Sequence, residues 1–277
     1  MTNKTLIKMI GITKSFPGVA ANNNVDFDLR SSEIHSILGE NGAGKTTLMN
    51  ILAGMHQPDA GTIIVRDQTV KIRSPQDSLR LGIGMVYQHF TLIPNLTVIE
   101  NLVLGFEGGL FLNLKIAEQR LQKISAAYGL SINPERMIQD LSVSERQRTE
   151  ILKILFHKSG VLILDEPTSM LSPAETEDLF HTLTSLCKAG KSVVLITHNL
   201  SEALSISDRI TIMRSGKKAA ELSGDMLRAM DAKTASNRIL EVMFGAVPES
   251  RERVAEKIFA DEPVLELKRV EALNSQG

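Results

Sequence analysis

Residues 39–46 have the types and spacing of a phosphate-binding loop. They read Gly39-Glu40-Asn41-Gly42-Ala43-Gly44-Lys45-Thr46, which matches G-x-x-x-x-G-K-[ST]. Glycine lets successive backbone N–H groups point at one polyphosphate without a clashing Cβ atom. Lys45 supplies a positive charge for the outer phosphates, and the hydroxyl of Thr46 is a suitable Mg²⁺ ligand. The pattern therefore predicts a polyphosphate site with a bound Mg²⁺.

The flanking residues favour this site over a simple glycine-rich turn that carries a surface lysine. Residues 34–38 read as a strand and residues 46–53 as an apolar-rich helix. The loop would then join the end of a strand to the N-terminus of a helix. Backbone N–H groups and the helix dipole attract anions at that position.

An acidic pair follows a second predicted strand. Residues 161–164 are four branched apolar residues, which is typical of a strand buried on both faces, and Asp165 and Glu166 come next. Asp165 is suited to holding Mg²⁺, and Glu166 to polarising a water molecule. The alternative is a solvated acidic pair before a helix, because Pro167 follows.

Two further polar residues close predicted strands. Gln88 follows the strand predicted at 84–87, and His198 follows the strand predicted at 193–197. Either residue alone is weak evidence, since polar groups are common at strand ends. Together with the acidic pair they indicate one site at the carboxyl edge of a parallel sheet.

Composition limits the class of protein. The chain has 277 residues, is 43% hydrophobic and has a net charge of −1, which supports a sizeable core and gives no basic field for nucleic acid. The single cysteine, Cys187, excludes an intrachain disulfide and reads as a packing residue. No apolar run is long enough to span a bilayer, and the N-terminus has no signal-peptide core. We expect a soluble cytoplasmic chain.

Strand and helix patterns alternate along the chain, which predicts an α/β fold. The expected strands are 6–12, 25–29, 33–38, 61–65, 70–72, 84–87, 161–164, 193–197, 209–213 and 218–222, and the expected helices are 46–53, 75–81 and 173–188. Residues 96–157 look like a helical insertion, broken at 105–109 and at Pro134. After Gly245 the chain turns polar and charged, as in a linker, and 264–267 look like a strand.

In this order the motifs resemble those of the ABC (ATP-binding cassette) ATPases, over almost the whole chain. The likeness implies a P-loop NTPase cassette with an N-terminal antiparallel β part, a RecA-like parallel sheet and a helical subdomain. It identifies a glutamine loop at Gln88, a Walker B motif at Asp165 and Glu166, and a switch histidine at His198. It also identifies a signature loop, Leu141-Ser142-Val143-Ser144-Glu145.

The resemblance assigns a role to each site residue. Glu166 would be the general base, and His198, Gln88 and Lys45 would complete the catalytic set. ATP would be held by Phe16, Gly39, Glu40, Asn41, Gly42, Ala43, Gly44, Lys45, Thr46 and Thr47, and Mg²⁺ by Thr46, Gln88 and Asp165. Phe16 would stack on adenine, with a buried core position as its alternative. The signature loop would contact the ATP held by a partner cassette.

Several segments narrow the resemblance to the importers of nucleosides and simple sugars. They are Phe16-Pro17-Gly18-Val19, Gln88-His89-Phe90, Pro94-Asn95-Leu96-Thr97-Val98 and Asp165-Glu166-Pro167-Thr168. Members of that branch usually carry two cassettes in one chain of about twice this length. We therefore expect a first cassette at 1–245, with its helical subdomain at about 96–157. Residues 246–277 would be a linker and the possible first strand of a second cassette.

The resemblance also implies partners and a location. The partners would be the second cassette, two transmembrane permease subunits docked near Gln88 and the helical segment, and, indirectly, a substrate-binding lipoprotein. No nucleic acid is expected. The chain would lie at the cytoplasmic face of the cell membrane as a peripheral protein.

The signature departs from the family pattern at two positions. The family signature normally has glycine where Ser144 stands, and glutamine or a similar neutral residue where Glu145 stands. A Cβ atom and a negative charge there would weaken contact with the partner's ATP. The alternative is a normal helix start, capped by serine, with Glu145 turned to solvent.

Two other functions are alternatives. A soluble ABC protein of translation or DNA repair would carry a basic linker, or a coiled coil with a metal-binding cysteine pair, and neither is found in this sequence. An ATP-binding module with little hydrolysis is favoured by the altered signature and disfavoured by Glu166.

Overall fold

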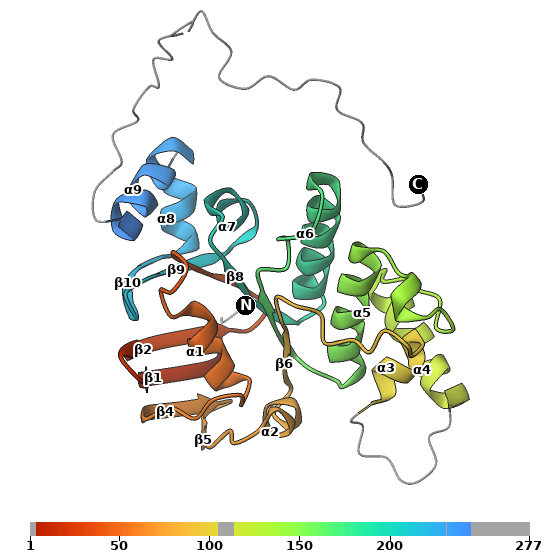
Figure 1. Cartoon of the computed structure of the whole chain (residues 1–277). Coiled ribbons are helices and arrows are strands. Elements are labelled where there is room, and N and C mark those ends of the chain that lie inside the picture. Colours follow the sequence, from red (N-terminus) through yellow and green to blue (C-terminus); the bar gives the residue numbers. More distant parts are fainter. Residues whose placement is uncertain (1–3, 105–113, 231, 245–277) are drawn as a thin grey trace, which may run out of the picture.

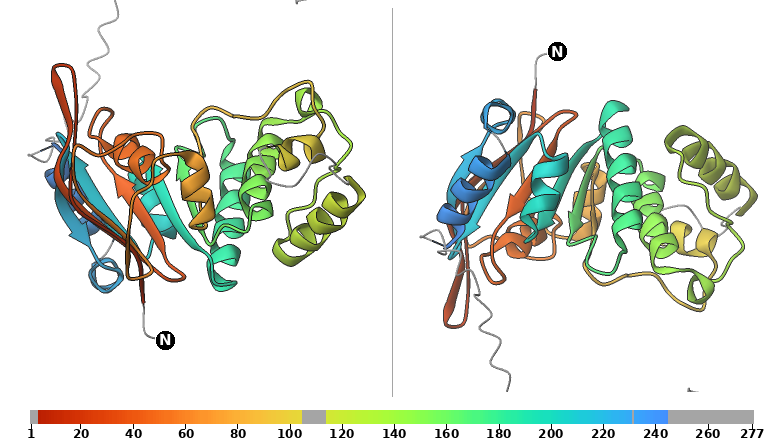
Figure 2. Two further views of the ribbon diagram at one scale, coloured as in Figure 1. Left: turned by 90° about the horizontal axis from the view of Figure 1, so that it is seen from below. Right: turned by 90° about the horizontal axis from the view of Figure 1, so that it is seen from above.

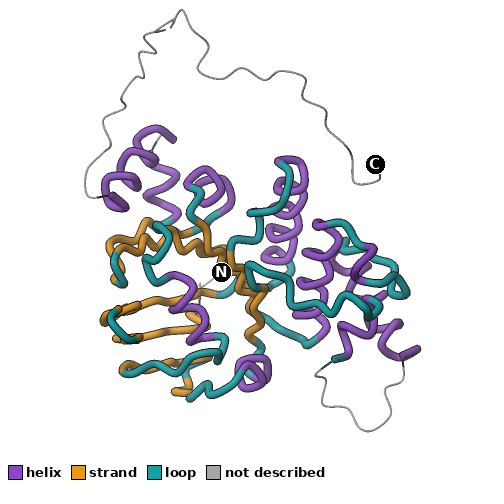
Figure 3. Tube along the Cα trace, in the orientation of Figure 1, coloured by secondary structure: helices purple, strands orange, loops and turns teal. Residues whose placement is uncertain are grey.

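The computed structural model describes residues 4–104, 114–230 and 232–244, and it places two sheets beside a group of helices (Figure 1). Figure 3 shows the strands of both sheets adjoining one another in one half of the molecule. Figure 2 shows the helices between residues 98 and 156 gathered at the opposite end. The expected α/β fold, with an antiparallel part, a parallel core and a helical part, is confirmed.

The smaller sheet is antiparallel, in the order β2-β1-β4-β5. Its strands are β1 (Thr5–Phe16), β2 (Val19–Arg30), β4 (Ala60–Val65) and β5 (Gln68–Val70). In β1, Ile7 and Met9 are buried and Lys8 and Ile10 are exposed, so one face packs on the core and the other faces solvent.

The larger sheet has the order β10-β9-β3-β8-β7-β6, with every pair parallel except β9 and β10. Its strands are β3 (Ile34–Leu38), β6 (Ile83–Val86), β7 (Val161–Asp165), β8 (Ser192–Thr197), β9 (Arg209–Arg214) and β10 (Lys217–Leu222). Leu162 and Leu164 of β7 pack with the helical group, whereas Val161 and Ile163 pack toward the antiparallel sheet. Burial on both faces explains the continuous apolar run.

The described helices pack against the sheets or belong to the helical group at the other end of the molecule. They are α1 (Lys45–Leu52), α2 (Pro75–Arg80), α3 (Val98–Val103), α4 (Leu114–Tyr128), α5 (Val143–Phe156), α6 (Pro173–Lys188), α7 (Leu200–Ile206), α8 (Gly224–Ala229) and α9 (Ala232–Phe244). Three of them begin with a reciprocal capping box, at Thr97, Ser142 and Ser172. Among the described helices, none has the length and apolarity needed to cross a membrane.

The strand expected at 70–72 begins earlier, at Gln68. Arg66 and Asp67 both have left-handed backbones, with φ of 49° and 65°, which makes the tight hairpin turn that reverses the chain directly after Val65. The expected helical break at 105–109 and the strand at 264–267 lie outside the described residues.

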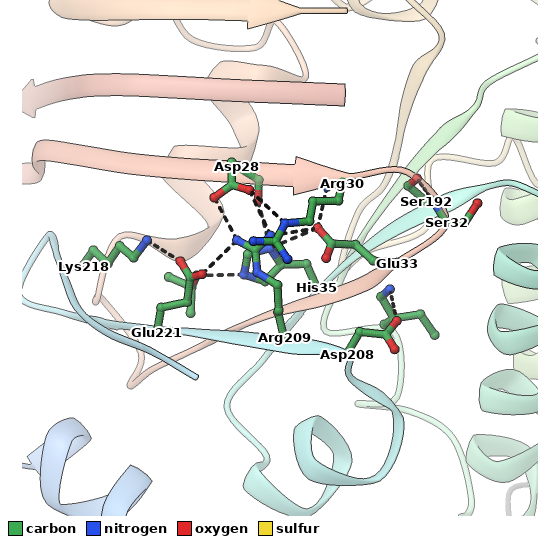
Figure 4. Close-up of polar contacts among 12 residues, drawn as sticks. Asp28, Arg30, Ser32, Glu33, His35, Ser192, Asp208, Arg209, Lys218 and Glu221 are labelled. Carbon is green, nitrogen blue, oxygen red and sulfur yellow. Dashed lines mark hydrogen bonds and ion pairs between the residues drawn. The ribbon is translucent and has the colours of Figure 1, made fainter. Parts of the chain in front are cut away.

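A buried cluster of charges joins the two sheets (Figure 4). The side chain of Arg209, on β9, is 3% exposed and pairs with Asp28 at 2.8 Å, Glu33 at 3.3 Å and Glu221 at 3.0 Å. Asp28 belongs to β2, and Glu33 lies directly before β3, the strand that leads into the phosphate-binding loop. The cluster therefore fixes the antiparallel sheet against the strand that positions this loop.

His35 is fully buried beside this cluster, and its hydrogen bonds identify its tautomer. The backbone oxygen of Asp28, 2.9 Å from Nδ1, can only accept, so Nδ1 carries the proton. Nε2 then accepts from the hydroxyl of Thr211 at 2.8 Å. Burial, together with the charge of Arg209, lowers the pKa of His35 to about 3.

Unfolding should therefore become easier in mild acid because of His35. The folded pKa lies below the ordinary value of 6.5, so the unfolded chain takes up the proton first. The stability due to neutral His35 is complete above pH 6.5 and is lost as the pH falls toward 3. Between pH 7.5 and pH 5 the loss should be about 2 kcal/mol, measured by urea unfolding.

His35→Gln removes this titration, so its unfolding free energy should change less between the two pH values. The control is His181→Gln, at an exposed position on α6. The same pH dependence in His35→Gln as in the unaltered chain would contradict the assignment.

Candidate functional site

The phosphate-binding loop joins the end of β3 to the start of α1. Gly42 and Gly44 have φ of 82° and 96°, backbone conformations that side-chain-bearing residues rarely adopt. A Cβ atom on Gly44 would lie 2.2 Å from the backbone oxygen of Ala21. Glycine is therefore required here by both conformation and space. The loop then continues into α1, and the first turn of that helix leaves backbone N–H groups without intrahelical partners.

Lys45 is folded into the loop and is 5% exposed. Its ammonium group donates to the backbone oxygens of Gly39 at 2.8 Å and Glu40 at 3.0 Å. Burial lowers the pKa of Lys45, while the charges of Glu166 and Asp165 oppose that shift. The lysine thus places a cation inside the curve of the loop.

Asp165 ends β7 and is 3% exposed, and its carboxylate accepts a hydrogen bond from the hydroxyl of Thr46 at 3.2 Å. Burial raises the pKa of Asp165 above its usual value, against the hydrogen bond from Thr46. Two of the three side chains predicted as Mg²⁺ ligands, Thr46 and Asp165, are therefore in contact. Their oxygens are the donor type that Mg²⁺ prefers, which satisfies the chemical requirement for the ion.

Glu166 is held between the two other polar residues that close strands. One carboxylate oxygen accepts from Nε2 of Gln88 at 3.2 Å, and the other lies 3.0 Å from Nδ1 of His198. The backbone of Glu166 is left-handed, with φ of 45°, and its N–H donates to Ile196 at 3.0 Å. Such a conformation costs about 1–3 kcal/mol and is concentrated at functional sites.

A cavity of about 400 Å³ opens over these groups. It is lined by Val19, Ala21, Asn41, Gly42, Ala43, Gly44, Lys45, Thr46, Thr47, Gln88 and Glu166. The structure thus brings most of the phosphate-binding loop together with Gln88 and Glu166 in one open cavity. Of the other predicted site residues, Gly39, Glu40, Asp165 and His198 are not part of its lining.

Phe16 lies outside that lining, at the end of β1. Its residue is 38% exposed, so the alternative of a buried core position is wrong. The ring packs edge-on against His56, with 5.3 Å between the ring centres, and the ammonium of Lys14 lies 5.6 Å from its centre. This exposed ring lies three residues before Val19, the first cavity-lining residue of the next strand, and is available to a flat ligand.

The signature residues form the start of α5. Ser142 caps the helix, and Glu145 reaches back to accept from the Ser142 N–H at 2.8 Å. Glu145 also pairs with Arg136 at 2.6 Å and is not simply turned to solvent. The backbone hydrogen bond from Ser142 is the main cause that lowers the pKa of Glu145. The effect of Ser144 and Glu145 on a partner's ATP stays a prediction, as does the contact expected of Leu141 and Val143.

Asn22 is a structural contact to the loop that the sequence analysis missed. It is fully buried, and its amide donates to the backbone oxygen of Gly44 at 3.1 Å. The residue stands in the run Asn22-Asn23-Asn24, which reads as a solvent-exposed turn and gives no signal of burial.

Comparison with known proteins agrees with this geometry. A family model described as "ABC transporter" matches residues 22–169, just over half of the chain. The nucleoside import ATP-binding protein NupA of Lactococcus lactis is 44% identical over all of this chain and 54% of its own length. The guanosine import protein NupO of Bacillus subtilis is 49% identical over 76% of this chain and 42% of its own. The chain thus spans about half the length of the curated relatives it matches.

Solved structures show the same fold. An ATP-binding cassette in its ADP conformation, MJ1267, superposes with a TM-score of 0.76 at 23% identity, over 87% of this chain and 99% of its own. A dimeric cassette, MJ0796, superposes with a TM-score of 0.68 at 26% identity, over 79% of this chain and 99% of its own. With the motifs, the cavity and these matches in agreement, the chain belongs to the ABC transporter family of nucleotide-binding cassettes.

Proposed function

We propose that this chain is the ATP-binding and hydrolysing subunit of an ABC importer for nucleosides or simple sugars. The observation that carries the proposal is the carboxylate of Glu166, held by Gln88 and His198 at the rim of the phosphate-binding cavity. A carboxylate so placed can accept a proton from an attacking water. The cargo class rests on relatives described as nucleoside, guanosine, glucose and ribose import proteins.

Different residues of the chain would bind the phosphates, hold Mg²⁺ and activate water. The backbone of residues 39–47 and the ammonium of Lys45 would bind the phosphates. Thr46 and Asp165, with Gln88, would hold Mg²⁺, whose charge neutralises the phosphates during transfer. Glu166 would take the proton from water, and His198 would contact the terminal phosphate.

A second depression is the proposed docking site for a permease subunit. It encloses about 220 Å³ between α2, β6 and α5, and Met85, Leu104 and Ile154 give it an apolar lining beside Glu150 and Lys153. Tyr87, next to Gln88, also lines it, so this groove and the catalytic cavity share one loop. An apolar groove with a few polar groups is suited to an amphipathic helix.

The remaining partners and the location follow from this assignment. A second cassette would complete each ATP site with its signature loop, and a substrate-binding lipoprotein would act through the permease. The chain would lie at the cytoplasmic face of the cell membrane. Residues 1–245 would form the cassette, and the linker and strand expected at 246–277 lie outside the described residues.

The test is to co-express the chain with candidate permease subunits and to measure affinity capture and phosphate release. Capture with the permease and transport-coupled hydrolysis are expected. A chain that binds ATP but releases no phosphate in the captured complex would be a regulatory module instead. If no permease is captured, the chain would instead be a soluble ABC protein of the translation or DNA-repair type.

Phe16→Ala should weaken ATP binding by about 1–2 kcal/mol, because adenine loses the ring face on which it stacks. Binding of inorganic triphosphate, which has no base, should be unchanged. Isothermal titration of both ligands measures the difference. If the folded variant binds ATP as tightly as the unaltered chain, Phe16 does not stack on adenine.

A further inference from the structure

Glu202 joins the two chain segments that carry Glu166 and His198. It lies in the first turn of α7, and one of its carboxylate oxygens accepts from the hydroxyl of Thr197 at 2.9 Å. The other oxygen accepts from the hydroxyl of Thr168 at 2.9 Å and from the amide of Asn199 at 3.1 Å. Thr168 lies two residues after Glu166, and Thr197 and Asn199 flank His198.

His198 needs such support because packing does not hold it. Its side chain is 56% exposed, and it follows the last residue of β8. Glu166 likewise lies just past β7, in a left-handed conformation. The 3.0 Å separation between His198 Nδ1 and the carboxylate of Glu166 therefore depends on how the two segments beyond the strands are fixed to each other.

We propose that Glu202 is a positioning residue for hydrolysis: its carboxylate fixes the His198 segment against the Glu166 segment. The inference rests on the proposed ATPase function. Glu202 does not line the catalytic cavity, so it acts through the other two residues. A carboxylate suits the task because it offers only acceptors to three donors, whereas a glutamine would turn an NH₂ group toward at least one of them.

Helix capping does not account for this arrangement. The side-chain oxygen of Asn199 caps α7 by accepting from the N–H groups of Ser201 and Glu202, at 3.0 Å and 3.4 Å. That cap needs no carboxylate at position 202. The bond from Thr168 comes from 34 residues away in the sequence and contributes nothing to the helix start.

Glu202→Gln tests the proposal in the complex of this chain with its permease. Hydrolysis should lose about tenfold in kcat, since small displacements of catalytic groups reduce rate strongly, while the KM for MgATP stays within about twofold. Thr168→Val should reproduce the loss. Ser205→Ala, one turn further along α7, is the matched control and should leave kcat within about twofold. Within the described part of the chain, its hydroxyl bonds only to the backbone oxygen of Glu202.

A second measurement needs no turnover. In the full chain with ¹³C-labelled histidine, the His198 ring resonance, identified by its loss in His198→Ala, should move in Glu202→Gln and stay in place in Ser205→Ala. The resonances of the other five of the six histidines should be unchanged. Normal kcat in Glu202→Gln, a change confined to KM, or a loss of kcat with the His198 resonance unmoved would each overturn the proposal.

Glu166→Gln, measured in the same complex, distinguishes a failure of the proposed ATPase function from a failure of the positioning role of Glu202. If that variant hydrolyses ATP normally, the proposed function itself fails. If it is inactive while Glu202→Gln is normal, only the positioning role of Glu202 fails.

Discussion

Glu166→Gln should leave MgATP binding within about twofold and lower hydrolysis by about 10²-fold or more, the scale of losing a general base. Glutamine has nearly the same shape and keeps one acceptor oxygen for His198, but it cannot take a proton from water. The phosphate contacts of the loop and Lys45 are untouched, so binding and turnover should separate. Titration of MgATP and steady-state phosphate release in the permease complex measure the two effects.

Glu177→Gln is the matched control, because that carboxylate lies on α6 with 77% of its side chain exposed. It should change neither binding nor turnover. Near-normal hydrolysis by Glu166→Gln in a competent complex would refute the assignment of the base.

The groove and the cavity suggest how a permease would influence this carboxylate. Gln88 donates to Glu166, and its neighbour Tyr87 lines the groove between α2, β6 and α5. A helix docked in that groove would press on the same short segment that holds one oxygen of the proposed base. If docking displaced Gln88, that oxygen of Glu166 would be free to contact water. Docking of the permease would then affect hydrolysis through two adjacent residues, Tyr87 and Gln88.

The parts of the fold with strong local signals could be predicted from the sequence. Residues 161–164 are buried on both sides, so they form a continuous apolar run, and Pro173 with Gly190 marks the two ends of α6. The loop at 39–46 has its own residue pattern. The meeting of Gln88 and His198 at Glu166 followed from a simple rule, because the carboxyl ends of parallel strands share one edge.

Features that depend on distant contacts could not be predicted in this way. The strand β2 begins at Val19 and runs through the polar residues Asn22 to Asn24, because it pairs with the end of β1. Asn23 also bonds to Gly216, in the hairpin between β9 and β10. The helices α7, α8 and α9 were not expected from the sequence. The first two are only one to two turns long, too short to show a helical pattern of apolar residues. Glu202 contacts Thr168, which is 34 positions away in the sequence, and Arg209 contacts Asp28, which is 181 positions away. No local sequence pattern encodes such contacts.

Arg209→Met should destabilise the chain by about 3–5 kcal/mol at pH 7.5, the usual cost of leaving buried charges without their partner. Glu33, with 4% of its side chain exposed, would lose its nearest cation, and Asp28 would lose a bidentate pair. Arg214→Met, at the exposed end of the same strand, is the control. It loses one exposed hydrogen bond, to the backbone oxygen of Val242, and should cost about 1 kcal/mol or less. Urea unfolding compares the two variants.

The pH dependence of that loss, together with a second substitution at Glu33, identifies its cause. Both are needed because the charge of Arg209 also lowers the pKa of His35. Burial already raises the pKa of Glu33 above its usual value, and the charge of Arg209 opposes the shift. Without Arg209 this pKa should rise further, and a group with a raised folded pKa stabilises the fold below that pKa and loses the effect as pH rises through it. The penalty should therefore be smaller at pH 5.5 than at pH 7.5, and Arg209→Met combined with Glu33→Gln should recover part of it at pH 7.5. A penalty that is equal at both pH values and unchanged by Glu33→Gln would mean that Arg209 stabilises the fold by packing alone.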